Sequence, residues 1–468
     1  AGLRWACIRF HTCARNQPPW SDGHPLRSCM LLTIRVILRS HTAIGEKGAC
    51  LAITMLHCSI RMAVESMNRP ERMNRRGFLS CSALGLGCVA LPHGLRAAVR
   101  DRSPWSDVFA RMPPSLAALV DDPRHAVQLR WVRIARDADG VRRFVTHDRG
   151  LAPRRWFPAA SVTKLPMALL MAEAVQAAGG AADSTLRLDA APASGEWGDE
   201  PLADTFARGV DRTFAISENR PFNRWYELLG GDHIHRRLAA LGYPHVRLIA
   251  RLGSSDIEAN RRSGGGALLS TDGRTLRRFP AAVAMARRFP FGRVLVGDGW
   301  QNDDGSIVRG PHDFSHANFL PLADSLRMLQ AFVSPESVPL AQRWKIDGAL
   351  RARLLRALGL RPRESTAPTY PEADYPDGHA RWFFVGDGRA RYPDGLSVSG
   401  KSGMAYGSLS EVAYVVDRDS GVECMLAASI LVNADGIFND DRYEYDTIGI
   451  PFMAAWARAV LEVERGQR

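Results

Sequence analysis

The chain has 468 residues, 46% hydrophobic and 24% charged, which suits one large globular domain or two to three average ones. No run of 18 apolar residues occurs, so we expect no stable membrane span. The formal net charge is +12, but Lys and Arg outnumber Asp and Glu by 13 to 4 in residues 1–98 and only by 48 to 45 in residues 99–468. Because the body is nearly neutral, we expect no nucleic-acid partner.

Cysteine and histidine usage argues against a disulfide or metal framework in the body. Seven of the eight cysteines precede residue 99, and Cys424 lies in an apolar run where we expect a core residue. No Cys/His cluster has the spacing of a zinc site. His312 and His316 have i, i+4 spacing, but no HExxH surrounds them and their stretch is loop-like. We predict no metal and no cofactor.

The N-terminal part indicates export. Residues 73–80 (MNRRGFLS) begin like a twin-arginine signal, a short apolar stretch follows at 81–91, and small residues come at 97–98. We therefore interpret residues 73–98 as a signal peptide that directs the chain to the periplasm or outside the cell. Residues 1–72 show no sustained hydrophobic period, and we interpret them as an upstream translation artefact or a disordered segment.

The elements of residues 99–468 begin with a hairpin. Residues 127–134 alternate in strand fashion, and a turn leads into 142–147. Residues 166–174 are apolar nearly all round, which predicts a buried helix. Further helices are expected at 224–229, 235–241, 320–333 and 451–465, and further strands at 396–399, 411–416 and 423–432. Strands at both ends of a helical middle predict an α+β fold, with an antiparallel sheet drawn from both termini that carries helices.

Two stretches of this body differ in composition. Residues 261–315 are rich in Gly, Arg and Asp, and residues 361–394 are rich in Pro, Tyr, Asp and Gly. We predict insertions or long loops there, either functional lids or partly disordered segments.

The first chemical motif is Ser161-Val162-Thr163-Lys164, at the entrance to the buried helix. Ser161 and Lys164 lie one helical turn apart on the same face. Burial depresses the pKa of a lysine, so that a neutral amine can take the serine proton. Only four lysines occur against 57 arginines, which suggests that the body lysines serve as amines able to lose a proton. Alone, the motif is more often a helix cap followed by a solvated lysine.

Two further motifs follow. Residues 217–219 (Ser-Glu-Asn) offer a hydroxyl that can pass a proton to a leaving nitrogen and an amide that can hold a carbonyl. Residues 401–403 (Lys-Ser-Gly) follow an expected strand, where a lysine and a hydroxyl can bind a carboxylate and a glycine lets a substrate approach. Each is a commonplace polar tripeptide when it stands alone.

In this order the three motifs resemble those of the serine β-lactamases and penicillin-binding proteins, and residues 161–166 and 399–407 are most similar to class A β-lactamases. The resemblance implies a β-lactamase/transpeptidase-like fold with a mainly helical subdomain. It implies Ser161 as nucleophile, Lys164 as its base and Ser217 as proton shuttle. The implied substrate-binding groups are Asn219 for the acylamide, Lys401 and Ser402 for the carboxylate, Gly403 for close approach, and the Met404 amide, with that of Ser161, for the oxyanion.

The base for the second half of the reaction is left open. Residues 256–260 (Asp-Ile-Glu-Ala-Asn) stand where class A enzymes carry their deacylating glutamate. The resemblance therefore implies Asp256 as that catalytic base, with Glu258 as the alternative.

The resemblance implies an exported, monomeric serine hydrolase. It would form an acyl-enzyme with a β-lactam, or with a related small amide or ester such as a peptidoglycan-like substrate. The alternatives are a slowly turning over penicillin-binding protein or D-alanyl peptidase, and an esterase. A more remote alternative is a nucleotide-binding P-loop, because residues 395–402 match GxxxxGK[ST]. That motif needs an apolar strand before it and a helix after it, whereas here a polar turn precedes and an alternating strand follows.

Overall fold

A computed structural model describes residues 103–388 and 391–467, which lie in the compact unit Arg100–Arg468. The predicted signal peptide at 73–98 and the segment 1–72 fall outside the described residues. Among the described helices, none is both long enough and apolar enough to cross a bilayer.

The central sheet has five antiparallel strands in the order β13-β14-β15-β1-β2. The strands are β1 (Gln128–Arg136), β2 (Arg142–Arg149), β13 (Leu396–Ala405), β14 (Ser408–Asp417) and β15 (Val422–Leu431). The N-terminal hairpin joins the C-terminal strands where Trp131 of β1 lies opposite Leu426 of β15. This sheet confirms the predicted α+β fold drawn from both termini.

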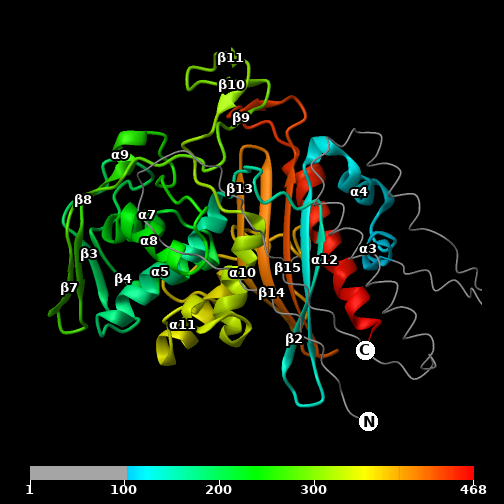
Figure 1. Cartoon of the computed structure of the whole chain (residues 1–468), viewed down its shortest axis with the longest axis horizontal. Coiled ribbons are helices and arrows are strands. Elements are labelled where there is room, and N and C mark those ends of the chain that lie inside the picture. Colours follow the sequence, from blue (N-terminus) through cyan, green and yellow to red (C-terminus); the bar gives the residue numbers. More distant parts are fainter. Residues whose placement is uncertain (1–102, 389–390, 468) are drawn as a thin grey trace, which may run out of the picture. The chain divides into compact units, whose positions relative to one another are not determined.

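Helices cover both faces of the sheet (Figure 1). One side carries α12 (Ile450–Arg465) with α3 (Pro104–Phe109) and α4 (Pro114–Ala118). The other side carries α10 (Leu322–Val333) and the buried α5 (Lys164–Ala177). The expectation of a core cysteine is confirmed, because Cys424 is fully buried.

The helical part surrounds α5. It consists of α6 (Phe206–Ala215), α7 (Arg220–Leu229), α8 (Gly231–Ala240) and α11 (Gly348–Leu358), with the short α9 (Ile257–Arg261) beyond them. The amphipathic α7 packs its apolar side on α5, and its Trp225 is fully buried. Helices α6 and α11 were not predicted from the sequence.

The first expected insertion, residues 261–315, is more ordered than predicted. It holds the short strands β5 (Arg262–Ser263), β6 (Gly266–Leu269), β7 (Thr275–Phe279), β8 (Ala282–Val283), β9 (Leu295–Val296), β10 (Gly299–Gln301), β11 (Ile307–Arg309) and β12 (His312–Asp313). β6 and β7 extend a sheet with β3 (Thr185–Leu188) and β4 (Ala203–Thr205), and β16 (Ile437–Phe438) pairs with β10. Runs of two to five residues are too short to show a strand period in sequence.

Candidate active site

Ser161 lies in a 3₁₀ turn, Ala160–Thr163, that runs directly into α5. Lys164 is the first residue of that helix, so its side chain folds back over the turn. Its Nζ donates a hydrogen bond to Ser161 Oγ at 2.6 Å. The preceding residue, Ala160, has φ 44°, a left-handed conformation that is uncommon for a side chain with a Cβ. The local backbone thus presents the hydroxyl to the amine.

The amine of Lys164 is fully buried. Burial lowers its pKa from 10.5 to about 7, against the opposing charges of Glu196 and Glu218. Around neutral pH a large fraction of this amine is therefore unprotonated and able to accept the Ser161 proton.

Ser217 lies between two amines. It sits in the turn between α6 and α7 with φ 66°, another left-handed backbone at a non-glycine residue. Its Oγ is 3.1 Å from Lys164 Nζ and 2.8 Å from Lys401 Nζ. A hydroxyl that contacts both amines can relay a proton between them.

Lys401 reaches this hydroxyl from β13 and is 2% exposed. Burial, followed by the nearby charge of Lys164, holds its pKa well below the usual lysine value. Its Nζ also donates to the carbonyl oxygen of Ser402 at 2.9 Å. The structure thus joins Ser161, Lys164, Ser217 and Lys401 in one chain of hydrogen bonds, although 240 residues separate the first from the last.

Gly403 packs its main chain against the nucleophile turn. A Cβ at this position would lie 2.4 Å from Ala159 O and 2.9 Å from Ser161 N, so a side chain has no room. The carbonyl of Ser402 accepts a hydrogen bond from Lys401 and so points away from β14. Along an antiparallel strand, successive residues direct their main-chain N–H and C=O groups alternately toward and away from the neighbouring strand. The amide of Met404 therefore points to the same open edge, on the side of Ser161.

Ser402, which was expected to bind a substrate carboxylate, already has a hydrogen-bond partner in the structure. It is 2% exposed, and its Oγ donates to the carbonyl oxygen of Ala380 in the second predicted insertion. The neighbouring Arg381, 3% exposed, donates to Gly400 O at 3.1 Å and to Phe214 O at 3.2 Å. Segment 361–394 thereby ties β13 to the end of α6, and a carboxylate would have to replace Ala380 as the partner of Ser402.

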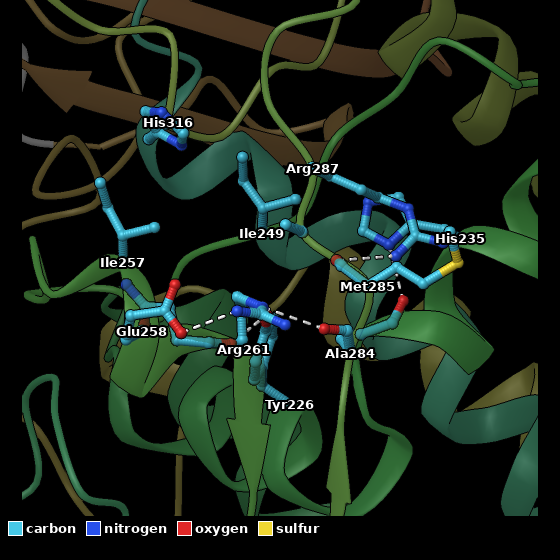
Figure 2. Close-up of a pocket in the computed structure, with 13 residues that line it drawn as sticks. Tyr226, His235, Ile249, Ile257, Glu258, Arg261, Ala284, Met285, Arg287 and His316 are labelled. Carbon is cyan, nitrogen blue, oxygen red and sulfur yellow. Dashed lines mark hydrogen bonds and ion pairs between the residues drawn. The ribbon is translucent and has the colours of Figure 1, made fainter.

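Among the described residues, no hydrogen bond or ion pair joins Asp256 or Glu258 to this group. Asp256 is exposed and caps α9, where it accepts a hydrogen bond from Ala259 N at 2.9 Å. Glu258 is paired with Arg261 at 2.7 Å and faces a separate pocket (Figure 2). That pocket is lined by residues that include His235 and Arg287, and by none of Ser161, Lys164, Ser217 and Lys401.

Asn219 is joined instead to a glutamate that the sequence analysis missed. Its Nδ2 donates to Glu196 Oε2 at 2.7 Å. Glu196 belongs to the loop between β3 and β4, whose sequence carries no motif to single it out. Two main-chain bonds hold this residue: its N donates to Leu252 O at 3.0 Å, and its O accepts from Asn223 Nδ2 at 2.9 Å.

Glu218, the middle residue of the second motif, has a structural partner. Its carboxylate makes two hydrogen bonds of 2.6 Å with Arg212, which is 6% exposed and also binds Glu200 and Asp204. This buried ion-pair network fixes the turn that carries Ser217.

The comparison with known families matches residues 143–285 to the β-lactamase enzyme family. No curated protein is similar to the chain in sequence. Among solved structures, a β-lactamase from Sphaerobacter thermophilus is 18% identical, with a TM-score of 0.42 over 78% of this chain and 98% of that chain. A β-lactamase from Desulfarculus baarsii is 15% identical (TM-score 0.42, 76% and 98%), and PBP-A is 14% identical (TM-score 0.41, 77% and 97%).

The matched stretch contains two of the three motifs, those of Ser161 and Ser217, while Lys401 lies beyond it. Residues 143–285 are therefore similar to the β-lactamase enzyme family, which confirms the resemblance to penicillin-recognising serine hydrolases.

Proposed function

We propose that the protein is an exported serine hydrolase that forms an acyl-enzyme at Ser161. Its substrate would be a β-lactam or a related small amide or ester, and residues 73–98 would direct it to the periplasm or outside the cell. The observation that carries the proposal is the position of the Lys164 amine, 2.6 Å from Ser161 Oγ and 3.1 Å from Ser217 Oγ. One neutral amine contacts both the nucleophile and a hydroxyl able to pass the proton on.

The proposed acylation uses each group once. Lys164 takes the proton of Ser161 as Oγ bonds to the substrate carbonyl carbon. The amides of Ser161 and Met404 stabilise the oxyanion. The proton then passes through Ser217 to the leaving nitrogen as the carbon–nitrogen bond breaks. The Lys401 amine can donate a hydrogen bond to an anionic group of the substrate beside that nitrogen.

Covalent capture tests this proposal. Purified full chain is incubated with a penicillin or a fluorophosphonate probe and weighed as intact protein. We expect one adduct per chain on wild type and on the control Ser255→Ala, which changes an exposed serine, and no adduct on Ser161→Ala. Capture by Ser161→Ala equal to that of wild type would exclude the proposed nucleophile.

A second candidate, a penicillin-binding protein that acylates and then stalls, is favoured by one observation. Neither Asp256 nor Glu258, the two bases implied by the resemblance, makes a described contact with the group around Ser161. Steady nitrocefin hydrolysis separates the two candidates, because a stalled protein gains mass without continued turnover.

A further inference from the structure

We infer that Glu196 is the catalytic carboxylate that activates water to release the acyl group from Ser161. This inference rests on the proposed function and assigns its second half-reaction to the loop between β3 and β4. The residues first expected there, Asp256 and Glu258, belong to a different segment and are engaged elsewhere.

The first argument is position. Asn219 lies two residues after Ser217 in the same turn, and its amide holds Glu196 Oε2 at 2.7 Å. The Glu196 main chain is fixed on both sides by Leu252 and by the fully buried Asn223. The carboxylate is therefore held beside the turn that carries the proton relay, by a backbone that packing keeps in place.

The second argument is availability. The negative charges of Glu196 and Glu218 both raise the pKa of Lys164, and Glu196 has the larger effect. Glu218 is bound by both arms of Arg212 and cannot also accept a proton from water without losing that pair. No ion pair joins Glu196 to a cation within residues 103–388 and 391–467, and the side chain is solvent-exposed. Its Oε1 is thus open to a water molecule.

The third argument is the space beside it. Gly253 adopts φ 77°, and a Cβ there would lie 3.0 Å from Glu196 N and 3.2 Å from Glu196 Cβ. The segment that leads to Asp256 thus has no side chain at Gly253, where a Cβ would press against Glu196. Glu196 lies next to Asn219, whereas the carboxylates of Asp256 and Glu258 are exposed.

The step balances as follows. A water oxygen bonds to the acyl carbon on Ser161 Oγ while Glu196 accepts a water proton. The tetrahedral intermediate then collapses, and the carbon–Oγ bond breaks. The proton on Glu196 returns to Ser161 Oγ by way of the Lys164 amine, which leaves a free acid and the starting enzyme.

The test measures the formation of the acyl adduct on the protein separately from the loss of that adduct. Full-length wild type, Glu196→Gln and the control Glu258→Gln are acylated with a penicillin, freed of excess reagent and followed by intact mass. Gln keeps an oxygen acceptor for Asn219 but removes the base. We expect all three to gain the adduct at rates within about threefold, and Glu196→Gln to lose it about 10²-fold more slowly than the other two.

A second readout distinguishes a base from a structural support. Formate added to Glu196→Gly should speed loss of the adduct, since a small carboxylate can replace a missing base but not a missing packing contact. Should Glu196→Gln fail to fold, the same measurement on Glu196→Asp is expected to show intermediate slowing.

The outcomes are distinct. No adduct on wild type overturns the proposed function. An adduct that Glu196→Gln loses as fast as wild type, that wild type never loses, or that Glu196→Gln never gains overturns the assignment of Glu196 while leaving Ser161 as the nucleophile.

Discussion

At the scale of single residues, the site depends on amines rather than on positive charge. Two of the four lysines, Lys164 and Lys401, are buried, and both amines contact Ser217 Oγ. The same chain has 57 arginines. An arginine stays charged at any pH that a protein tolerates, so it cannot accept the serine proton. A lysine at these positions therefore supplies what an arginine could not, an amine that can lose its proton.

The lowered pKa of Lys164 gives a pH prediction. Because the neutral amine is the reactive form and its pKa is about 7, capture should rise with pH through 7 and level off above it. At pH 6 we expect a capture rate roughly a tenth of the plateau. The rate is measured with a fluorophosphonate probe between pH 5 and 9.

Matched variants check this profile. Lys164→Arg should abolish capture, whereas Lys345→Arg, at an exposed lysine, should leave both the rate and the profile unchanged. A profile that is flat from pH 5 to 9 in wild type would contradict the role of Lys164 as base.

At the residue level, a contact could be predicted from the sequence where it is local, and the motif order brought the more distant groups into the prediction. Ser161 and Lys164 are one turn apart, so their contact follows from sequence, and the motif order placed Ser217 and Lys401 with them. Glu196 could not be found in this way. Its position depends on Asn223 and Leu252, which are distant in sequence, and a lone glutamate in a loop carries no pattern.

At the scale of elements, long periodic segments were predictable and short ones were not. The all-round apolar run of α5 and the alternation of β1 are strong signals, and both elements appear within two residues of their expected starts. α11 was missed although Leu350, Leu354 and Leu358 repeat at helical spacing. The strands of residues 261–315 are stabilised by pairing with distant partners, which no local pattern records.

The segment between α8 and β6 depends on one buried ion pair. Arg251 and Glu227 are each 2% exposed, and Arg251 Nε lies 2.5 Å from Glu227 Oε1. Arg251→Met would leave a buried carboxylate unpaired, so we expect the free energy of unfolding to fall by about 3–5 kcal/mol. Urea titration followed by tryptophan fluorescence measures the change.

An exposed pair supplies the control. Arg278 and Asp189 bind each other with side chains 55% and 41% exposed. Arg278→Met should cost less than about 1 kcal/mol. Equal losses in the two variants would show that the buried pair has no special role.

At the scale of the whole molecule, both halves of the chain contribute to the group around Ser161. The helical part supplies Ser161, Lys164 and Ser217, and the sheet supplies Lys401. The sequence analysis predicted that both ends of the chain would contribute to one sheet, because the strands at its two ends flank a helical middle and must pair with one another. It could not predict that segment 361–394 would bind Ser402.

Metal removal is a further test of the whole molecule. Within the described residues, no group of three or more His, Cys, Asp and Glu side chains is arranged to hold a metal ion. The proposed chemistry is carried by hydroxyls and amines, so dialysis against EDTA should leave the rate of probe capture and the melting temperature unchanged. A loss of capture that added zinc restored would contradict this expectation.

The sheet order β13-β14-β15-β1-β2 also constrains synthesis on the ribosome. The proposed nucleophile, Ser161, is translated early. Lys401 follows 240 residues later, and β15, the strand that pairs with the first hairpin, is complete only at residue 431. Until then the nascent polypeptide contains Ser161 without Lys401 and without the completed sheet. If the proposed function holds, we expect products of premature termination to be unreactive, because the late strands have not yet joined the early ones.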